Sequence, residues 1–156
     1  MRASVNAMFA GLKGRVQRKK PVVSYDRADA YRDCVMRVMR IHHKVIVSAG
    51  EERERGLEDA LISPMAIEGF CDRLEYCPDC FSKAAMAIDY IANFHPFVEG
   101  NKRTAFQLAV AILRAGGYEP DDDEATFRFM KDAAWGRIER EEIEDWLRRN
   151  THVSNP

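Results

Sequence analysis

The stretch of sequence that decides the fold covers residues 81–115 and reads FSKAAMAIDYIANFHPFVEGNKRTAFQLAVAILRA. Within it, residues 83–94 and 101–115 are apolar on almost every side of a helix. A helix that is apolar all round is a buried one, so these two segments are predicted to form a central buried pair. The polar residues between them, 95–100, are predicted to form the loop that joins the pair.

The rest of the chain is predicted to place further helices around that pair. Four segments have helical patterns, over residues 25–48, 57–62, 121–135 and 139–150. The second is short and is expected to stop at Ser63-Pro64, with irregular chain or a short helix after it. No segment alternates like a strand. The predicted fold is therefore all-α, a compact bundle of about six helices around the central pair, which Trp135 and Trp146 should help to cover.

Length and charge suggest one folded domain with a basic extension. The 156 residues fit a single domain, which we place at residues 21–150, with a tail over 151–156. Residues 1–20 hold six basic side chains and no acidic one, although the net charge of the whole chain is -1. Such an arm is expected to be a solvated terminus, so we assign it no nucleic-acid partner. No apolar run is long enough for a membrane span or a secretory signal, which predicts a cytoplasmic protein with no membrane partner.

The four cysteines are expected to be reduced thiols, since disulfides are rare in cytoplasmic proteins. Cys77-Pro78-Asp79-Cys80 has a spacing found in metal sites. A structural zinc ion needs four ligands, and the sequence offers no second paired spacing nearby. No zinc site is predicted.

The loop between the two buried helices concentrates residues that bind anions. Pro96 disfavours helical geometry at His95, and Gly100-Asn101 suits a turn and a helix start. The second helix then directs its free N–H groups and positive dipole end at the loop. Lys102 and Arg103 lie in that first turn, where cations are unfavourable unless an anion compensates. This combination predicts binding of a polyphosphate.

Two further side chains of the loop could take part in chemistry. Glu99 would repel phosphate unless a divalent cation lies between them, which is how carboxylates take part in Mg²⁺–nucleotide sites. His95 titrates near neutral pH and could accept a proton from a hydroxyl. The alternative is purely structural: Glu99 pairs with Lys102 or Arg103, and His95 hydrogen-bonds a backbone carbonyl.

Read as a string, residues 95–105, HPFVEGNKRTA, resemble the signature loop of the Fic/Doc family. The Fic branch follows His-x-Phe-x-Asp/Glu-Gly-Asn-Gly-Arg-x-x-Arg. The Doc branch, the death-on-curing toxins, has Lys after Asn, as in His-Pro-Phe-Val-Asp-Gly-Asn-Lys-Arg-Thr-Ala. The similarity extends over about residues 30–149, which would make 21–150 a Fic/Doc domain that uses ATP and Mg²⁺.

The resemblance implies a role for each residue of the loop. His95 would be the general base, Phe97 would anchor the loop in the core, and Glu99 would hold Mg²⁺. Gly100 and Asn101 would shape an anion hole, while Lys102 and Arg103 would contact the phosphates. Residues 50–64 would form a flap that docks the target protein.

The residue after Asn bears on which group is transferred. Lys102 resembles the Doc branch and favours a toxin-like kinase that moves the γ-phosphate of ATP onto a Ser or Thr of another protein. The resemblance makes the translation machinery a candidate target and an antitoxin an expected partner. Glu99-Gly100 is common in relatives that transfer AMP, so AMP transfer (AMPylation) remains an alternative. A non-catalytic interaction module is a further alternative.

Overall fold

The computed structural model describes residues 25–121 and 123–154. In chain order the elements are α1 (Tyr25–Ala49), the short 3₁₀ helix η2 (Glu52–Glu54), α2 (Pro64–Leu74), α3 (Cys80–Phe94), α4 (Asn101–Ala115), β1 (Tyr118–Pro120), α5 (Glu124–Ala134), α6 (Arg140–Arg149) and β2 (Thr151–Val153). The described part of the chain thus contains six α-helices, which confirms the all-α prediction. The basic arm, residues 1–20, lies outside the described residues.

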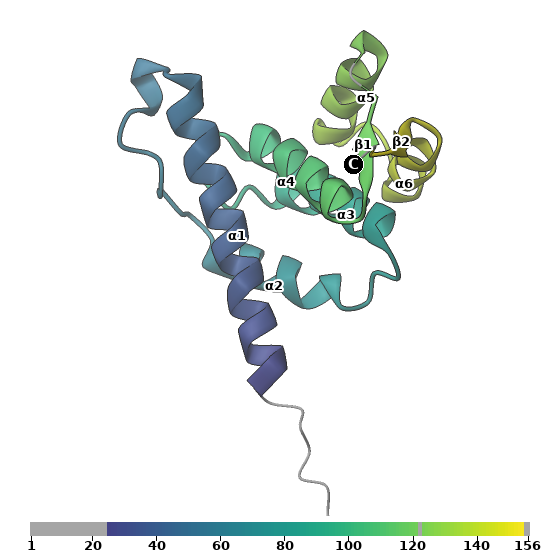
Figure 1. Cartoon of the computed structure of the whole chain (residues 1–156). Coiled ribbons are helices and arrows are strands. Elements are labelled where there is room, and N and C mark those ends of the chain that lie inside the picture. The colour runs from purple at the N-terminus through teal and green to yellow at the C-terminus, as the bar shows by residue number, and fades with distance from the viewer. Residues whose placement is uncertain (1–24, 122, 155–156) are drawn as a thin grey trace, which may run out of the picture.

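Helices α3 and α4 form the centre of the molecule, as their apolar sequences predict. They make the most extensive contact of any two elements, and Figure 1 shows them side by side between α1 and the pair α5 and α6. Ala84, Ala87 and Ile91 of α3 and Ala105 and Ala109 of α4 are at most 1% exposed. Alanines at these positions let the two helix backbones approach closely, so the loop between them is held on a rigid support.

Helix α2 begins where a helix was expected to stop. Residues 57–62 form no helix, which makes that prediction wrong, and Pro64 instead occupies the first turn of α2 after the cap residue Ser63. Proline is favoured there because its missing N–H is one that the first turn leaves unpaired anyway. The segment before Pro64 is extended and lies against the 95–100 loop.

A two-stranded antiparallel sheet joins β1 to β2 and was not predicted. Tyr118 pairs with Val153, and Pro120 pairs with Thr151. The strands have three residues each, too few for an alternating pattern to show in the sequence. Pairing of β2 brings the end of α6 back to the chain that leaves α4.

The expectation of reduced cysteines is wrong for one pair. Cys34 of α1 and Cys71 of α2 form a disulfide, with their Cα atoms 5.9 Å apart, while Cys77 and Cys80 are free. The pair is 37 residues apart in sequence and meets only because α1 packs on α2. The bond links α1 covalently to α2.

None of the helices in the described ranges is long and apolar enough to cross a membrane.

Candidate active site

The backbone of the loop presents the start of α4. Helix α3 ends at Phe94, and His95 follows in the left-handed conformation with φ 46°. Gly100, with φ 74°, is the N-cap residue of α4, and its carbonyl accepts the Thr104 N–H at 2.8 Å. The amides of residues 101–103 precede the helical hydrogen-bonding pattern and remain free for a ligand. The loop therefore has the helix-start geometry that the sequence predicts, with Gly100 rather than Asn101 as the cap.

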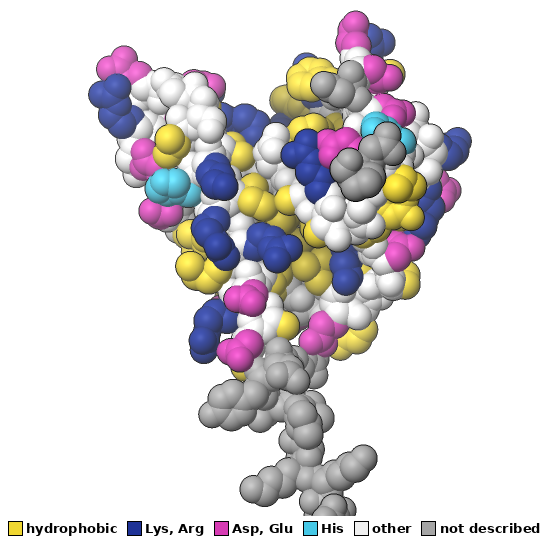
Figure 2. All heavy atoms as spheres, in the orientation of Figure 1, with side chains coloured by type: hydrophobic (Ala, Val, Ile, Leu, Met, Phe, Trp, Pro, Cys, Tyr) yellow, Lys and Arg dark blue, Asp and Glu magenta, His cyan; other side chains and the backbone are white. Residues whose placement is uncertain are grey.

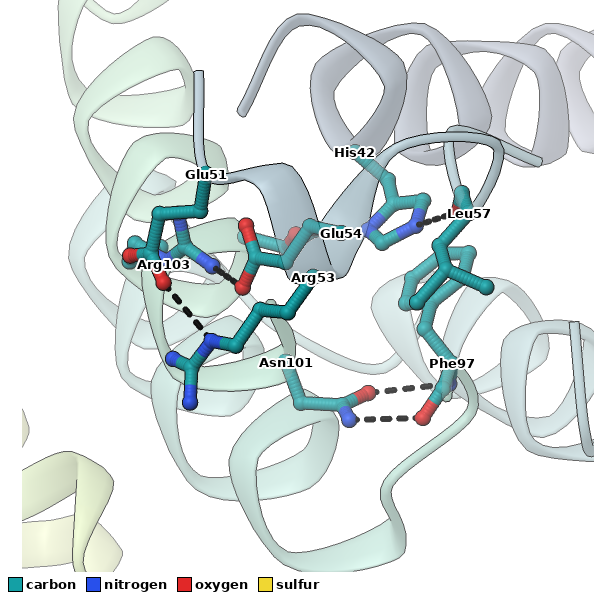
Figure 3. A network of polar contacts seen from close by, with 9 residues as sticks. His42, Glu51, Arg53, Glu54, Leu57, Phe97, Asn101 and Arg103 are labelled. Carbon is teal, nitrogen blue, oxygen red and sulfur yellow. Dashed lines mark hydrogen bonds and ion pairs between the residues drawn. The ribbon is translucent and has the colours of Figure 1, made fainter. Parts of the chain in front are cut away.

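The side chain of Asn101 holds the loop in shape. Its Oδ1 accepts the Phe97 N–H at 2.9 Å, and its Nδ2 donates to the Phe97 carbonyl at 2.8 Å, as Figure 3 shows. Asn101 is 7% exposed and Phe97 is fully buried. These paired bonds satisfy both backbone polar groups of a buried residue that belongs to no helix. The Phe97 ring anchors the loop in the core, as the resemblance implied.

Four segments meet at the buried ring of His42. The ring stacks on Phe97 with a centroid distance of 3.6 Å, and its Nδ1 lies 3.1 Å from the Thr104 hydroxyl. Its Nε2 lies 3.4 Å from the Leu57 carbonyl. Because a carbonyl can only accept, Nε2 carries the proton and Nδ1 accepts from Thr104. His42 therefore joins α1 to the flap, the loop and α4.

The chain before α2 pairs with the loop and forms the flap. The Ile62 N–H donates to the Pro96 carbonyl at 2.7 Å, and the Val98 N–H donates to the Ala60 carbonyl at 3.1 Å. These bonds flank an isolated antiparallel bridge between Leu61 and Phe97. The flap thus lies beside His95 and Glu99, and two of its bonds fix the backbone on either side of Phe97.

His95 is exposed and has one nitrogen free for chemistry. Its Nδ1 lies 3.0 Å from the Asn93 carbonyl and must donate to it. In the neutral ring Nε2 is then unprotonated and can accept a proton. Part of the structural alternative, a histidine bonded to a backbone carbonyl, is thus realised, and it fixes the tautomer that a general base requires.

The other part of that alternative is wrong, since Glu99 pairs with neither cation of α4. In the described part of the chain no hydrogen bond or ion pair involves the half-buried Glu99 carboxylate. The Lys102 ammonium lies 3.0 Å from the centre of the Trp135 ring, in cation–π contact. Arg103 pairs with Glu54 of η2.

Trp135 is 55% exposed and contacts Lys102 rather than covering the central pair, while Trp146 stacks on Phe129.

A groove opens at the start of α4 and runs between α1, α4 and α5. Its volume is about 940 Å³, within the range of small-molecule sites. In Figure 2 this face of the molecule is notched between the end of α1 and α5, with apolar atoms at the floor. The groove has no acidic lining residue and five basic ones, namely Lys44, Lys102, Arg103, Arg114 and Lys131. Neither His95 nor Glu99 lines it; it meets the loop at Lys102 and Arg103.

The sequence matches the Fic/DOC family over residues 31–113, more than half of the chain. The chain belongs to the Fic/DOC family. Membership indicates ATP-dependent transfer of a nucleotide or a phosphate to a protein, the activity of enzymes in this family. The match covers the flap, the loop and all but the last two residues of α4. A comparison with curated proteins gave no match.

A metal ion brought by a nucleotide would need only one or two carboxylates from this Fic/DOC site. Within residues 25–121 and 123–154, no three His, Cys, Asp or Glu side chains gather into a cluster that could hold a metal ion. Magnesium commonly uses only one or two carboxylates, with phosphates and water completing its shell. Glu99, whose carboxylate makes no hydrogen bond or ion pair in these ranges, can supply one such ligand.

Two residues of the site were not predicted from sequence. Glu54 lies 49 residues before the arginine that it contacts, and Trp135 lies on the far side of the groove from α1. Neither position has a motif or spacing that links it to the loop. Only the fold brings them to α4.

Proposed function

We propose that the chain is a protein kinase of the Doc type that transfers the γ-phosphate of ATP to a Ser or Thr hydroxyl of another protein. The observation that carries this proposal is the free start of α4, where Lys102 and Arg103 join the loop to a basic groove without acidic lining. Amides, an ammonium and a guanidinium at one helix start suit a polyphosphate. The apolar floor of the groove, which includes Phe106 and Met130, suits the base and ribose.

In the proposed reaction the residues of the loop divide the work. His95 Nε2 takes the proton of the target hydroxyl, while Asn93 holds the ring through Nδ1. The hydroxyl oxygen bonds to the γ-phosphorus as the bond from that phosphorus to the β–γ bridging oxygen breaks, and ADP leaves. The amides of α4 and the Lys102 ammonium offset the charge on the transferring group. Bound Mg²⁺ would neutralise phosphate charge, and Glu99 is the residue proposed to hold it.

AMP transfer is a second candidate, favoured by one observation on Lys102. The resemblance to the Doc branch rests on Lys at this position, whose side chain would fill the room that Gly leaves for phosphates. Here the ammonium lies on the Trp135 ring, so part of that room can remain open. In AMP transfer the target oxygen would bond to the α-phosphorus, and pyrophosphate would leave.

The two candidates differ in which phosphate remains on the target. Purified protein would be incubated with a cell lysate and either γ-labelled or α-labelled ATP. We expect protein-bound label only from the γ position. Label from the α position alone would reject the kinase and support AMP transfer, and label from neither would reject both.

Exposed apolar residues around His95 support a protein as the acceptor. Ile62 and Met65, at the end of the flap and the start of α2, are 62% and 78% exposed, and Val98 of the loop is 48% exposed. Apolar side chains next to a backbone-paired flap suit an extended target segment.

We further propose that the protein is a toxin held inactive by an antitoxin. An acidic, partly apolar segment of such a partner would complement the groove and block its phosphate end at Lys102 and Arg103. Induced expression in a bacterial host should arrest growth, whereas expression of His95→Ala should not. Equal growth of the two cultures would contradict the toxin proposal.

A further inference from the structure

A buried carboxylate lies behind the cations of α4. Glu54 is the last residue of the short helix η2 and is only 1% exposed. The other two residues of η2, Glu52 and Arg53, are exposed. Its Oε1 pairs with Arg103 Nη2, and Figure 3 shows the two side chains pointing toward one another. Its Oε2 is also buried and lacks a hydrogen-bond partner in the described part of the chain. Arg103 is thus the ionic partner that compensates this buried charge.

The pair restricts where the guanidinium of Arg103 can go. Moving it away would leave the buried carboxylate without its ion-pair partner, a strongly unfavourable state. A guanidinium has five N–H donors in a fixed plane, and the contact to Glu54 uses Nη2. The Arg103 side chain is 39% exposed, so its remaining donors are open to a ligand at the groove. The contact with the carboxylate therefore restrains the position of the guanidinium while its remaining donors stay open to a ligand.

We propose that Glu54 is a positioning residue for phosphate binding: it fixes the Arg103 guanidinium at the start of α4 and links η2, at the base of the flap, to the bound nucleotide. This inference rests on the proposed function, in which Arg103 contacts phosphate. Glu54 itself touches no ligand. Glu54 affects nucleotide affinity through Arg103. The size of this effect depends on whether the Glu54 side chain is long enough to reach the guanidinium.

Two conservative variants of Glu54 separate the effect of its side-chain length from the effect of its charge. Glu54→Gln keeps the length and one acceptor oxygen for Arg103 but removes the charge. Glu54→Asp keeps the charge but shortens the side chain by one methylene and withdraws the oxygen from Nη2. Positioning predicts that Glu54→Asp is the more damaging variant. A purely electrostatic influence on the phosphates predicts instead that Glu54→Gln strengthens ATP binding, because it removes a negative charge, and that Glu54→Asp binds as the wild type does.

The test measures ATP binding to the full chain by isothermal titration calorimetry in the presence of Mg²⁺. We expect Glu54→Asp to raise Kd about tenfold, the size of one lost hydrogen bond to a charged group, and Glu54→Gln to stay within about threefold. Glu51→Gln is the matched control, because Glu51 is the N-cap residue of η2 and pairs with exposed Arg53 of η2, and it should bind ATP as the wild type does. Melting temperatures report folding of each variant separately.

A double-mutant cycle shows whether the effect passes through Arg103. In an Arg103→Ala background, Glu54→Asp should have no further effect on Kd. An equal effect in both backgrounds, or unchanged ATP affinity of Glu54→Asp with the wild-type Arg103, would overturn the inference while the proposed function stands. If the wild type itself binds no ATP, the proposed function fails and this inference falls with it.

Discussion

At the scale of single residues, His42 does most to fix the geometry of the loop. It is fully buried, stacks on Phe97 and bonds both Thr104 and Leu57. Burial lowers the pKa of the His42 imidazole from its usual range, and the Leu57 carbonyl opposes this only in part. The neutral ring is therefore the form that the native state favours.

This lowered pKa predicts a specific dependence of stability on pH. The unfolded chain binds a proton at His42 near pH 6.5, whereas the native chain does so only at lower pH, so unfolding takes up a proton between the two values. The contribution of His42 is fully present above about pH 6.5 and is lost as pH falls toward its native pKa.

Urea unfolding of the wild type and of His42→Gln from pH 7.5 to 5.0 would check this. The variant should be less stable at pH 7.5 and should lose less free energy of unfolding on acidification. Parallel losses in the two proteins would contradict the assignment of a neutral, buried His42.

At the scale of elements, the close approach of α4 to α1 decides where the free amides point. A Cβ on Gly100 would lie 2.8 Å from Ile46 Cδ1, and Ile46 is 3% exposed in the core. Gly100 also has φ 74°, which side chains other than glycine disfavour. Glycine thus lets the N-terminus of α4 lie directly against α1.

Gly100→Ala is expected to destabilise the fold more than a matched glycine substitution elsewhere. Gly117→Ala meets the same kind of positive φ, 84°, but with no atom within 4 Å, so it should cost only about 1 kcal/mol. Gly100→Ala should exceed that cost and also weaken ATP binding, because the start of α4 must shift. Thermal melts and ATP titrations of both variants measure the two effects. Equal destabilisation with unchanged ATP affinity would show that the close approach is unimportant.

Elements with an extreme sequence pattern were predictable, and short ones were not. The apolar pattern of 101–115 matches the bounds of α4, and the 25–48 prediction is one residue short of α1. The Ser63-Pro64 pair was interpreted as a helix stop, yet the same two residues cap and begin α2. The pattern alone does not distinguish these cases, because proline is compatible with both a helix end and a first turn.

At the scale of the whole molecule, the Cys34–Cys71 disulfide links two helices that position the site. It connects α1, which carries His42, to α2, which follows the flap. Closing a loop of this length lowers the entropy of the unfolded chain and should stabilise the fold by roughly 3–4 kcal/mol.

Two measurements on protein purified under oxidising conditions check the disulfide. Thiol titration in denaturant without reductant should detect Cys77 and Cys80 only, and all four cysteines after reduction. Dithiothreitol should lower the midpoint of urea unfolding, and Cys34→Ser should be insensitive to it. Detection of four thiols before reduction would show that the bond is absent in solution.

The loop motif encodes the geometry of the loop but not the residues that surround it. Residues close in sequence, such as Asn101 and Phe97, which are four positions apart, share a loop whose local geometry the motif encodes. Glu54 and Trp135 reach Arg103 and Lys102 from η2 and from the end of α5, through contacts that only tertiary structure creates. The flap pairing is made by backbone atoms and leaves no side-chain signature.

Transfer of label from ATP to a protein by His95→Ala, compared with the wild type, tests the central claim most directly. His152→Ala is the control, because His152 is an exposed histidine of β2 paired with Asp121, outside both the loop and the flap. We predict that His95→Ala loses at least about 100-fold in the rate of protein labelling, with an unchanged melting temperature, and that His152→Ala keeps the wild-type rate. A rate for His95→Ala close to that of the wild type would contradict the account, because no general base at His95 would then be needed.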